Sequence, residues 1–447
     1  MPQTLEKIDV SPEERFLTAF RANDGTTLNG SNARLSDIRQ DAIQQFEALG
    51  FPERKAEAYK YTNIQKVLQR NYTLQLAGAD APVTEEEIEP FLVPDMDAHL
   101  LVLVNGRFRD DLSDIGDLPE GVIVTGFAKA VAEHASLVEK HFAQYASYED
   151  DAFIALNTAF TQDGAFVYVP KSVALEKPVH IVSVVKAEGD VMLQPRYLFI
   201  AEENAQVKIV QTGRAISDTH TFTNAVVESY AGRHAHLDHY EIQDEGPKAA
   251  THLSTKSYQQ PESVVRTNAF TFSGELVRNN LRLLPDGEHC ESHLYGLVLG
   301  NGAMHVDNHT EVDHAKPDCF SSELYKHLVD DQSTAVFNGR VLVRQDSQRI
   351  NAYQSNDSLV LSEEADIYTK PELEIYADDV ECSHGATTGT LDEEAIFYLR
   401  SRGLTYAQAR ALLLVAFARD VLDNVQIEPL EQMLDRYVTD RFGLKGG

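Results

Sequence analysis

The stretch "YLFIAEENAQVKIVQTG" (residues 197–213) shows what kind of structure fills the middle of this chain. Two short runs of apolar and β-branched residues flank a polar turn, and no helical period passes through them. Similar runs recur between about residues 151 and 388, among them "NAVVESYAGRHAHLDHYEIQ" (224–243) and "AVFNGRVLVRQDS" (335–347). Strands without intervening helices predict a sandwich, a barrel or a stacked β-solenoid. Because the runs recur over so long a segment, we favour a β-solenoid core over residues 151–388.

The segment before this core, residues 1–150, is predicted to be mostly helical with a short strand segment. "SNARLSDIRQDAIQQFEALG" (31–50) spaces apolar residues three and four apart and ends on a glycine. Pro52 is placed to open a second helix. "HLLVLVNGRFRDDLSDI" (99–115) indicates a strand, an Asn-Gly turn and a second segment.

The segment after the core, residues 389–447, is predicted to be a C-terminal helical domain. Thr390–Glu393 and Thr405–Gln408 each fit a capping box, Gly403 is placed to end the first helix, and Pro429 is placed to begin the last one. The apolar residues of these helices cover more than one narrow stripe. They must therefore pack on the solenoid or on another protein.

The formal net charge of -31 argues against nucleic acid and anionic membranes as partners, because both are bound through clusters of Lys and Arg. The acidic residues are spread along the chain, which is typical of a solvated surface and would also suit a saline cytoplasm. The first residues, "MPQTLEKIDVSPEERF" (1–16), contain no apolar run like that of a signal peptide, and no stretch is long and apolar enough to span a bilayer. We therefore expect a cytoplasmic protein.

A candidate metal site lies in "DDVECSHGATTG" (378–389). If this segment is extended, Cys382 and His384 share one face, and thiolate with imidazole suits zinc or iron. Two ligands are too few for a tetrahedral metal, so others would come from Cys290, Cys319, further histidines or a second polypeptide. The alternative is a simple buried cysteine. With three cysteines and no CxxC pair, neither a disulfide framework nor a complete cluster cradle is expected.

Two further histidine groups are weaker candidates. "RHAHLDHYE" (233–241) would place His234 and His236 on one strand face, as in a cupin, or simply leave them facing solvent. "HVDNHTEVDHAKPDC" (305–319) gathers three histidines, several acids and Cys319, and suggests either a polar loop or a metal site. The chain lacks the GxxxxGK[ST] and GxSxG motifs. A carbohydrate-active β-helix enzyme and a cupin-like metalloenzyme remain the alternative functions.

The segment "KPELEIYADDVECSHGATTGTLDEEAIFYLRSRGL" (370–404) closely resembles the most characteristic segment of the SufB/SufD family of iron–sulfur cluster assembly scaffolds. "FPERKAEAYKYTNI" (51–64), "LNTAFTQDGAFVYVP" (156–170) and "SSELYKHLVDDQSTAVFNGRVLV" (321–343) resemble the family as well. "HGAT" at 384–387, where SufB proteins typically have "HEAT", and the low cysteine count resemble the SufD branch. One departure is Tyr59, where the family usually has Trp.

This resemblance implies a right-handed parallel β-helix core with helical N-terminal and C-terminal regions, in a scaffold subunit that is not itself an enzyme. It implies pairing with SufB through the ends of the two β-helices and binding of the SufC ATPase by the C-terminal helices. His384 would correspond to the interface histidine and Cys382 to its neighbour. A transient Fe–S cluster would then be shared with SufB. The resemblance leaves open whether a flavin joins the complex and whether the chain alone forms a homodimer.

Overall fold

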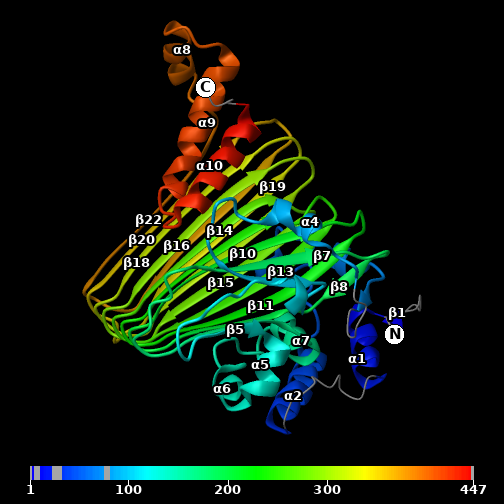
Figure 1. Cartoon of the computed structure of the whole chain (residues 1–447). Coiled ribbons are helices and arrows are strands. Elements are labelled where there is room, and N and C mark those ends of the chain that lie inside the picture. Colours follow the sequence, from blue (N-terminus) through cyan, green and yellow to red (C-terminus); the bar gives the residue numbers. More distant parts are fainter. Residues whose placement is uncertain (1–2, 5–10, 23–32, 75–80, 444–447) are drawn as a thin grey trace.

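The computed structural model describes residues 3–4, 11–22, 33–74 and 81–443. Half of the N-terminal stretch (1–16) on which the cytoplasmic expectation partly rests lies outside these residues. Within them, the middle of the chain is a β-solenoid of about 8 turns (Figure 1), and helices lie towards both termini. The predicted mainly β solenoid with helical terminal regions is therefore confirmed.

Two sheets form the solenoid, and consecutive long strands alternate between them. The 10-stranded sheet contains β3 (His99–Val104), β4 (Arg107–Phe108), β7 (Val179–Val185), β10 (Gln206–Ala215), β12 (His236–Asp244), β14 (Val264–Ser273), β16 (Glu291–Gly300), β18 (Phe320–Val329), β20 (Ile350–Val360) and β22 (Val380–Gly389). The 12-stranded sheet contains β1 (Gln3–Thr4), β2 (Thr73–Leu74), β5 (Ile123–Gly126), β6 (Gly164–Val169), β8 (Val191–Leu193), β9 (Arg196–Ala201), β11 (Thr221–Ala231), β13 (Ala249–Gln259), β15 (Leu276–Pro285), β17 (His305–His314), β19 (Thr334–Val343) and β21 (Asp366–Ile375).

From β10 onward the strands of each sheet pair in parallel with little change of register, so equivalent residues of successive coils stack in columns. Because side chains alternate along a strand, every second column faces the lumen of the solenoid. One lumen column, for example, contains Leu283, Val312, Val341 and Leu373. The early lumen is filled by one large apolar cluster that includes Leu101, Val167, Ile181, Phe199 and Leu237.

One corner of the coil repeats a left-handed residue just before six strands of the 10-stranded sheet, β10, β12, β14, β16, β18 and β20. These residues are Asn204, His234, Glu262, His289, Asp318 and Arg349, all with positive φ and spaced 30, 28, 27, 29 and 31 residues apart. Left-handed backbone outside glycine is uncommon and favours Asn, Asp and His. The repeated corner turns the chain at the same point in each coil and keeps the strands stacked.

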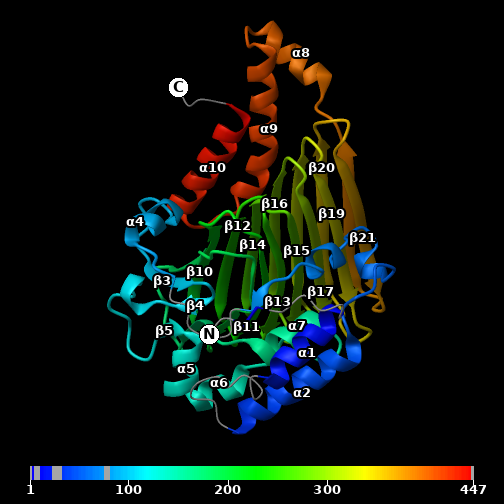
Figure 2. The same ribbon diagram turned by 90° about the vertical axis from the view of Figure 1, so that its right-hand side faces the viewer.

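Most of the N-terminal helices cover the outside of the early coils (Figure 2), whereas the segment around η1 (Glu57–Tyr59) reaches the last coil, where Glu57 contacts Lys370 and Tyr61 stacks on Tyr368. They are α1 (Pro12–Ala22), α2 (Ala33–Leu49), η1 (Glu57–Tyr59), α3 (Gln65–Leu68), α4 (Glu85–Ile88), η2 (Glu89–Phe91), η3 (Asp110–Leu112), α5 (Phe127–Glu133), α6 (Ala135–His141) and α7 (Ala152–Phe160). Phe16, Phe46 and Phe153 of α1, α2 and α7 pack in one cluster with Phe222 of β11 and Leu276 of β15.

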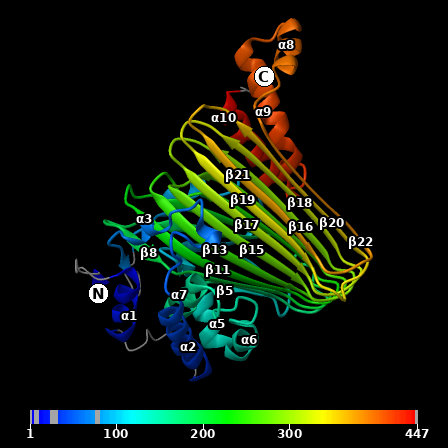
Figure 3. The same ribbon diagram turned by 180° about the vertical axis from the view of Figure 1, so that it is seen from behind.

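The C-terminal helices are α8 (Glu393–Ser401), α9 (Tyr406–Leu422) and α10 (Glu428–Phe442). α9 and α10 pack on the outer face of the 10-stranded sheet, where Leu414 and Leu434 join a cluster with Tyr240, Phe270 and Leu328. Figure 3 shows α8 beyond the edge of the strands, away from the N-terminal helices. Within the described ranges, no helix is both long and apolar enough to cross a membrane.

Several local predictions are confirmed. α2 ends at Gly50, which has a φ of +62°, and the Asn-Gly turn joins β3 to β4 as an antiparallel pair. The capping box at Thr405–Gln408 is present, and α10 carries Pro429 in its first turn. These signals are local, so the surrounding fold does not override them.

Other local predictions are wrong. Pro52 opens no long helix, because the segment is held against the sheet instead: the Tyr59 hydroxyl lies 3.2 Å from Nε2 of His252, and Oγ1 of Thr62 lies 2.9 Å from Nε2 of His305. Asp392, not Thr390, caps α8, since its side chain accepts a hydrogen bond from the backbone N–H of Glu394 at 2.8 Å.

Candidate functional site

Cys382 and His384 lie on β22, the last strand of the 10-stranded sheet. Within the described part of the chain, β22 pairs with β20 alone. The strand is extended, so the two side chains lie on the same face. Cys382 continues a lumen column above Ala352 and Ser321, and His384 continues the next column above Gln354 and Glu323. Both side chains are therefore placed at the mouth of the lumen. Cys382 is half-buried there and His384 is exposed.

The described residues leave this mouth partly uncovered. We call the last coil, formed by β21 and β22, the open end of the solenoid. Lumen-facing Leu373 on β21 is half-buried and Ile375 is exposed, whereas Val341 and Val343, one coil below, are fully buried. The C-terminal helices flank the sheet and do not lie over the end (Figure 2). The open end is thus a cross-section through the core, with Cys382 and His384 in it.

Apolar residues and the other two cysteines surround Cys382. Cys290 and Cys319 are buried and belong to the same hydrophobic cluster as Cys382. Their thiols both donate hydrogen bonds to the carbonyl oxygen of Gly287, at 3.2 and 3.1 Å. Burial raises the pKa of the Cys382 thiol above its usual range. In this chain alone the thiol form of Cys382 is therefore favoured over the thiolate, and a nearby cation or metal would be needed to deprotonate it.

Polar side chains lie below His384 in its column. Nε2 of Gln354 donates a hydrogen bond to Oε2 of Glu323 at 2.7 Å, and both side chains are buried. Burial raises the pKa of Glu323 to about 7. Oε1 of Gln354 and Oε1 of Glu323 find no hydrogen-bond partner among the described residues. The lumen beneath His384 thus offers unused acceptors, unlike the apolar lumen of the early coils.

His234 and His236 do not share a strand face, which corrects the sequence prediction. His234 is the left-handed corner residue before β12, with a φ of +56°, and its Nδ1 lies 3.2 Å from Oε2 of Glu262. His236 is the exposed first residue of β12. The local turn therefore separates the two imidazoles.

The segment 305–314 is strand β17 and not a polar loop, which corrects a second prediction. His305 contacts Thr62, and Nε2 of His309 lies 3.0 Å from Oδ1 of Asp307, which is also paired with Arg278. His314 faces the lumen and lies 2.9 Å from Oγ of Ser321. Over the described ranges, no group of three or more His, Cys, Asp or Glu side chains is arranged to hold a metal ion.

Comparison with known proteins shows which family the chain belongs to. A family model described as "SUF system FeS cluster assembly, SufBD core domain" matches residues 183–417, and one described as "SufBD protein N-terminal region" matches residues 10–181. The chain belongs to the SufBD family of iron–sulfur cluster assembly proteins. Together the two matches cover the helical N-terminal part, the solenoid and the start of the C-terminal helices.

Individual SufBD relatives align over nearly the whole chain. A SufBD family protein of Synechocystis is 32% identical over 99% of this chain and 98% of its own length. The iron–sulfur cluster assembly protein SufD of Escherichia coli is 28% identical, covering 91% of this chain and 93% of its own length. SufD of Bacillus subtilis is 26% identical, covering 95% and 97%.

A second surface of this SufBD protein was not identified residue by residue from the sequence. α8 and the start of α9 expose Phe397, Tyr398 and Tyr406, with 73%, 57% and 50% of their surfaces accessible, and Leu412 is also exposed. We call these four side chains the aromatic arm. The adjacent Phe397 and Tyr398 could have signalled it, because one helix face cannot bury both members of such a pair.

Proposed function

We propose that this chain is a non-catalytic scaffold subunit of a SufBCD-type complex. In this proposal its open end pairs with the end of a SufB-type β-solenoid, and a nascent iron–sulfur cluster is held as cargo between the two. The observation that carries the proposal is the position of Cys382 and His384, which extend lumen columns onto a cross-section of core that this chain leaves uncovered.

The ligand count supports a shared site. Thiolate and imidazole are ligands for Fe–S iron, but a tetrahedral iron needs more donors than these two. A second chain placed over the open end would supply the remaining donors. It would also bury the half-exposed apolar side chains of β21, such as Leu373. The incomplete set of metal ligands and the partly exposed apolar side chains thus both favour a partner at the open end.

The aromatic arm supports a second partner. Exposed Phe397, Tyr398 and Tyr406 form the kind of surface that protein interfaces bury, and aromatic residues often dominate binding energy there. We propose that a SufC-type ATPase subunit docks on it. Because α8 follows β22 within a few residues, movement of the arm would reach the strand that carries Cys382 and His384. A bias of about 3 kcal/mol would shift such a two-state element by about two orders of magnitude.

The test is anaerobic cluster reconstitution of this chain alone and of the chain co-expressed with its SufB-type and SufC-type subunits. We expect little iron on the isolated chain and a cluster on the complex, which His384→Ala weakens. His236→Ala is the matched control, because His236 is an exposed histidine of the same sheet far from the open end. If the isolated chain held a full complement of iron whether or not His384 was present, the shared-site proposal would be wrong.

A further inference from the structure

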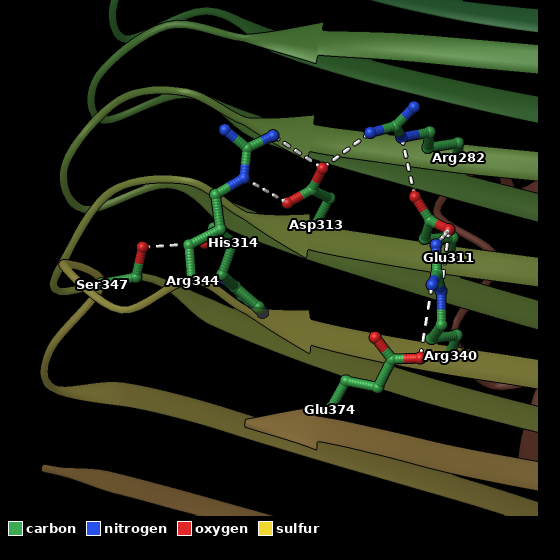
Figure 4. A network of polar contacts seen from close by, with 8 residues as sticks. All are labelled: Arg282, Glu311, Asp313, His314, Arg340, Arg344, Ser347 and Glu374. Carbon is green, nitrogen blue, oxygen red and sulfur yellow. Dashed lines mark hydrogen bonds and ion pairs between the residues drawn. The ribbon is translucent and has the colours of Figure 1, made fainter. Parts of the chain in front are cut away.

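The outer face of the 12-stranded sheet carries charges that alternate in sign from coil to coil. Arg282 of β15, Glu311 of β17, Arg340 of β19 and Glu372 of β21 are register partners in one column. Nε of Arg282 lies 2.8 Å from Oε1 of Glu311, and Nε of Arg340 donates a hydrogen bond to Oε2 of the same carboxylate at 2.9 Å. Figure 4 shows the side chains of Arg282 and Arg340 on the two sides of Glu311.

A neighbouring carboxylate follows the same rule. Asp313, which is 1% exposed, accepts hydrogen bonds from Arg282 at 2.6 Å and from Arg344 at 2.8 Å (Figure 4). These two arginines come from β15 and from the residue just after β19, so they approach Asp313 from opposite sides of β17. In these inner coils each carboxylate therefore lies between two guanidinium groups, one from each neighbouring coil.

The open end breaks this pattern. Glu374 of β21 is contacted by Nη1 of Arg340 at 3.3 Å, from the coil below. Glu372 is contacted by Nζ of Lys370 at 3.0 Å, from its own strand. Among the described residues no strand pairs with the other edge of β21. The two carboxylates therefore lack the cation that the alternation would place above them, and they stay 35% and 40% exposed.

The free edge of β21 is also suited to receive a strand. It is ten residues long and parallel to β19 throughout, and its lumen-facing side chains Leu373 and Ile375 are only partly covered. Proteins normally protect such edges because they pair readily with another strand. Opposite charges directly across a strand pair stabilise it, and like charges destabilise it.

We propose that the strand which extends the 12-stranded sheet across the open end carries Lys or Arg side chains opposite Glu372 and Glu374, and that these ion pairs set the register of the scaffold pair. This inference rests on the proposed pairing of two solenoid ends. Since both carboxylates lie on one face, the partner's basic residues are also two positions apart. A slip of one residue would turn every side chain of that strand to the wrong face.

A second copy of this chain is a poorer occupant of the same edge. On its outer face its own end strand offers the same two carboxylates but a single cation, Lys370, so it cannot place a cation opposite both Glu372 and Glu374, and each copy has a formal net charge of -31. Ion pairs at an interface act mainly on partner choice and register. The charge alternation thus selects a distinct partner with a basic outer strand.

The test is the affinity of the full chain for its scaffold partner, measured by titration calorimetry at low and high salt. We expect the double variant Glu372→Lys/Glu374→Lys to bind at least about tenfold more weakly, and reversal of the partner's two basic residues to Glu to restore binding. Asp117→Lys/Glu120→Lys is the control, because it makes the same change of net charge at exposed positions far from the open end. Glu372→Gln/Glu374→Gln keeps the side-chain size and should lose less affinity.

Each outcome discriminates. Equal weakening by the control pair would show that only net charge matters and would overturn the inference, as would an unchanged affinity of the reversed chain for its partner. If the unmodified chain bound no solenoid partner at all, the proposed function itself would fail. Circular dichroism and the melting temperature of each variant check that it is folded, and the Gln pair decides the matter if charge reversal prevents folding.

Discussion

At one end of the solenoid the strands β3, β6 and β7 are almost completely buried. At the other end β21 is only half-buried and β22 is largely exposed. The first coils are covered by α4 to α7, by β4 and by the loop after β4. Phe108 of β4 and Ile115 and Leu118 of the loop pack on the lumen cluster. Solenoids need polar or covered terminal coils to remain soluble. This chain has helices after β22 that could have covered the open end, but it packs them on the flank of the sheet. This difference between the two ends supports the proposal that the open end receives another chain.

The largest expected effect concerns a charge pair at the covered end. Arg196 and Glu228 are both fully buried, and the Glu228 carboxylate also accepts backbone hydrogen bonds from Ala143, Tyr145 and Ala146. Arg196→Ala should lower the free energy of unfolding by about 3–5 kcal/mol, because it leaves Glu228 buried without its cation. Denaturant unfolding checks this.

The matched variant at the other end is Arg349→Ala, which removes the partner of Asp318 in a more exposed pair. It should lower the free energy of unfolding far less than Arg196→Ala does, because solvent screens this pair. Equal losses in the two variants would contradict the idea that the two ends differ in how much their charge pairs matter to folding.

Leu283 and Leu373 sharpen the comparison, because they belong to one lumen column but lie in an inner coil and in the last coil. Leu283→Ala should destabilise the isolated chain by about 2–5 kcal/mol, since it opens a cavity in a closed core. Leu373→Ala should cost clearly less in the isolated chain and more in the complex. Thermal unfolding of both variants, each with and without the scaffold partner, measures these four losses of stability. A large loss for Leu373→Ala in the isolated chain would show that the last coil is already a closed core.

The buried carboxyl group of Glu323 makes the stability of the folded chain depend on pH. Burial raises its pKa from 4.5 to about 7 in the folded chain. Between these values the unfolded chain releases the proton and the folded chain keeps it, so this group makes the wild type less stable as the pH rises. The free energy of unfolding of Glu323→Gln should therefore rise relative to that of the wild type, by up to about 3 kcal/mol between pH 4.5 and pH 7. Above pH 7 this difference should stay constant. Unfolding midpoints across this range check the sign, and a gain that grew towards acid pH would refute it.

The smallest effect concerns the aromatic arm. Thr405 caps α9 by accepting a hydrogen bond from the backbone N–H of Gln408. Thr405→Ala should destabilise that helix start by about 1 kcal/mol. Hydrogen exchange should therefore become faster at the beginning of α9, with little change in the core strands. Uniformly faster exchange would mean that the arm and the solenoid unfold as one unit.

The β-solenoid could be predicted because short apolar runs recur along the chain with few helical periods between them. The helix α7 was missed within the β-rich region, since all its residues are buried and it therefore shows no amphipathic period. The segment after Pro52 was predicted as a helix because local signals cannot reveal that Tyr59 and Thr62 are held by residues of the sheet. Tertiary contacts decided both cases.

For the site, the two-residue period of a strand was enough to place Cys382 and His384 on one face. The local sequence does not show that this face points into the lumen or that it lies at the uncovered end. Both facts depend on how many coils precede β22. The prediction that His234 shares a strand face with His236 was wrong for a related reason. The left-handed φ of His234 belongs to a corner that repeats at intervals of 27 to 31 residues, too irregular to recognise from spacing alone.

Because α9 packs on the side of the sheet, the solenoid holds this helix at a fixed distance from the open end. Lys326 of β18 is paired with Asp420 near the end of α9, so the helix is fastened at that coil. Two strand spacings separate β18 from β22 in the same sheet, which is about 10 Å. Removing the one coil between β18 and β22 would bring the fastening point about 5 Å closer to the open end. The number of coils thus fixes the separation between the two surfaces through which this subunit would meet its partners.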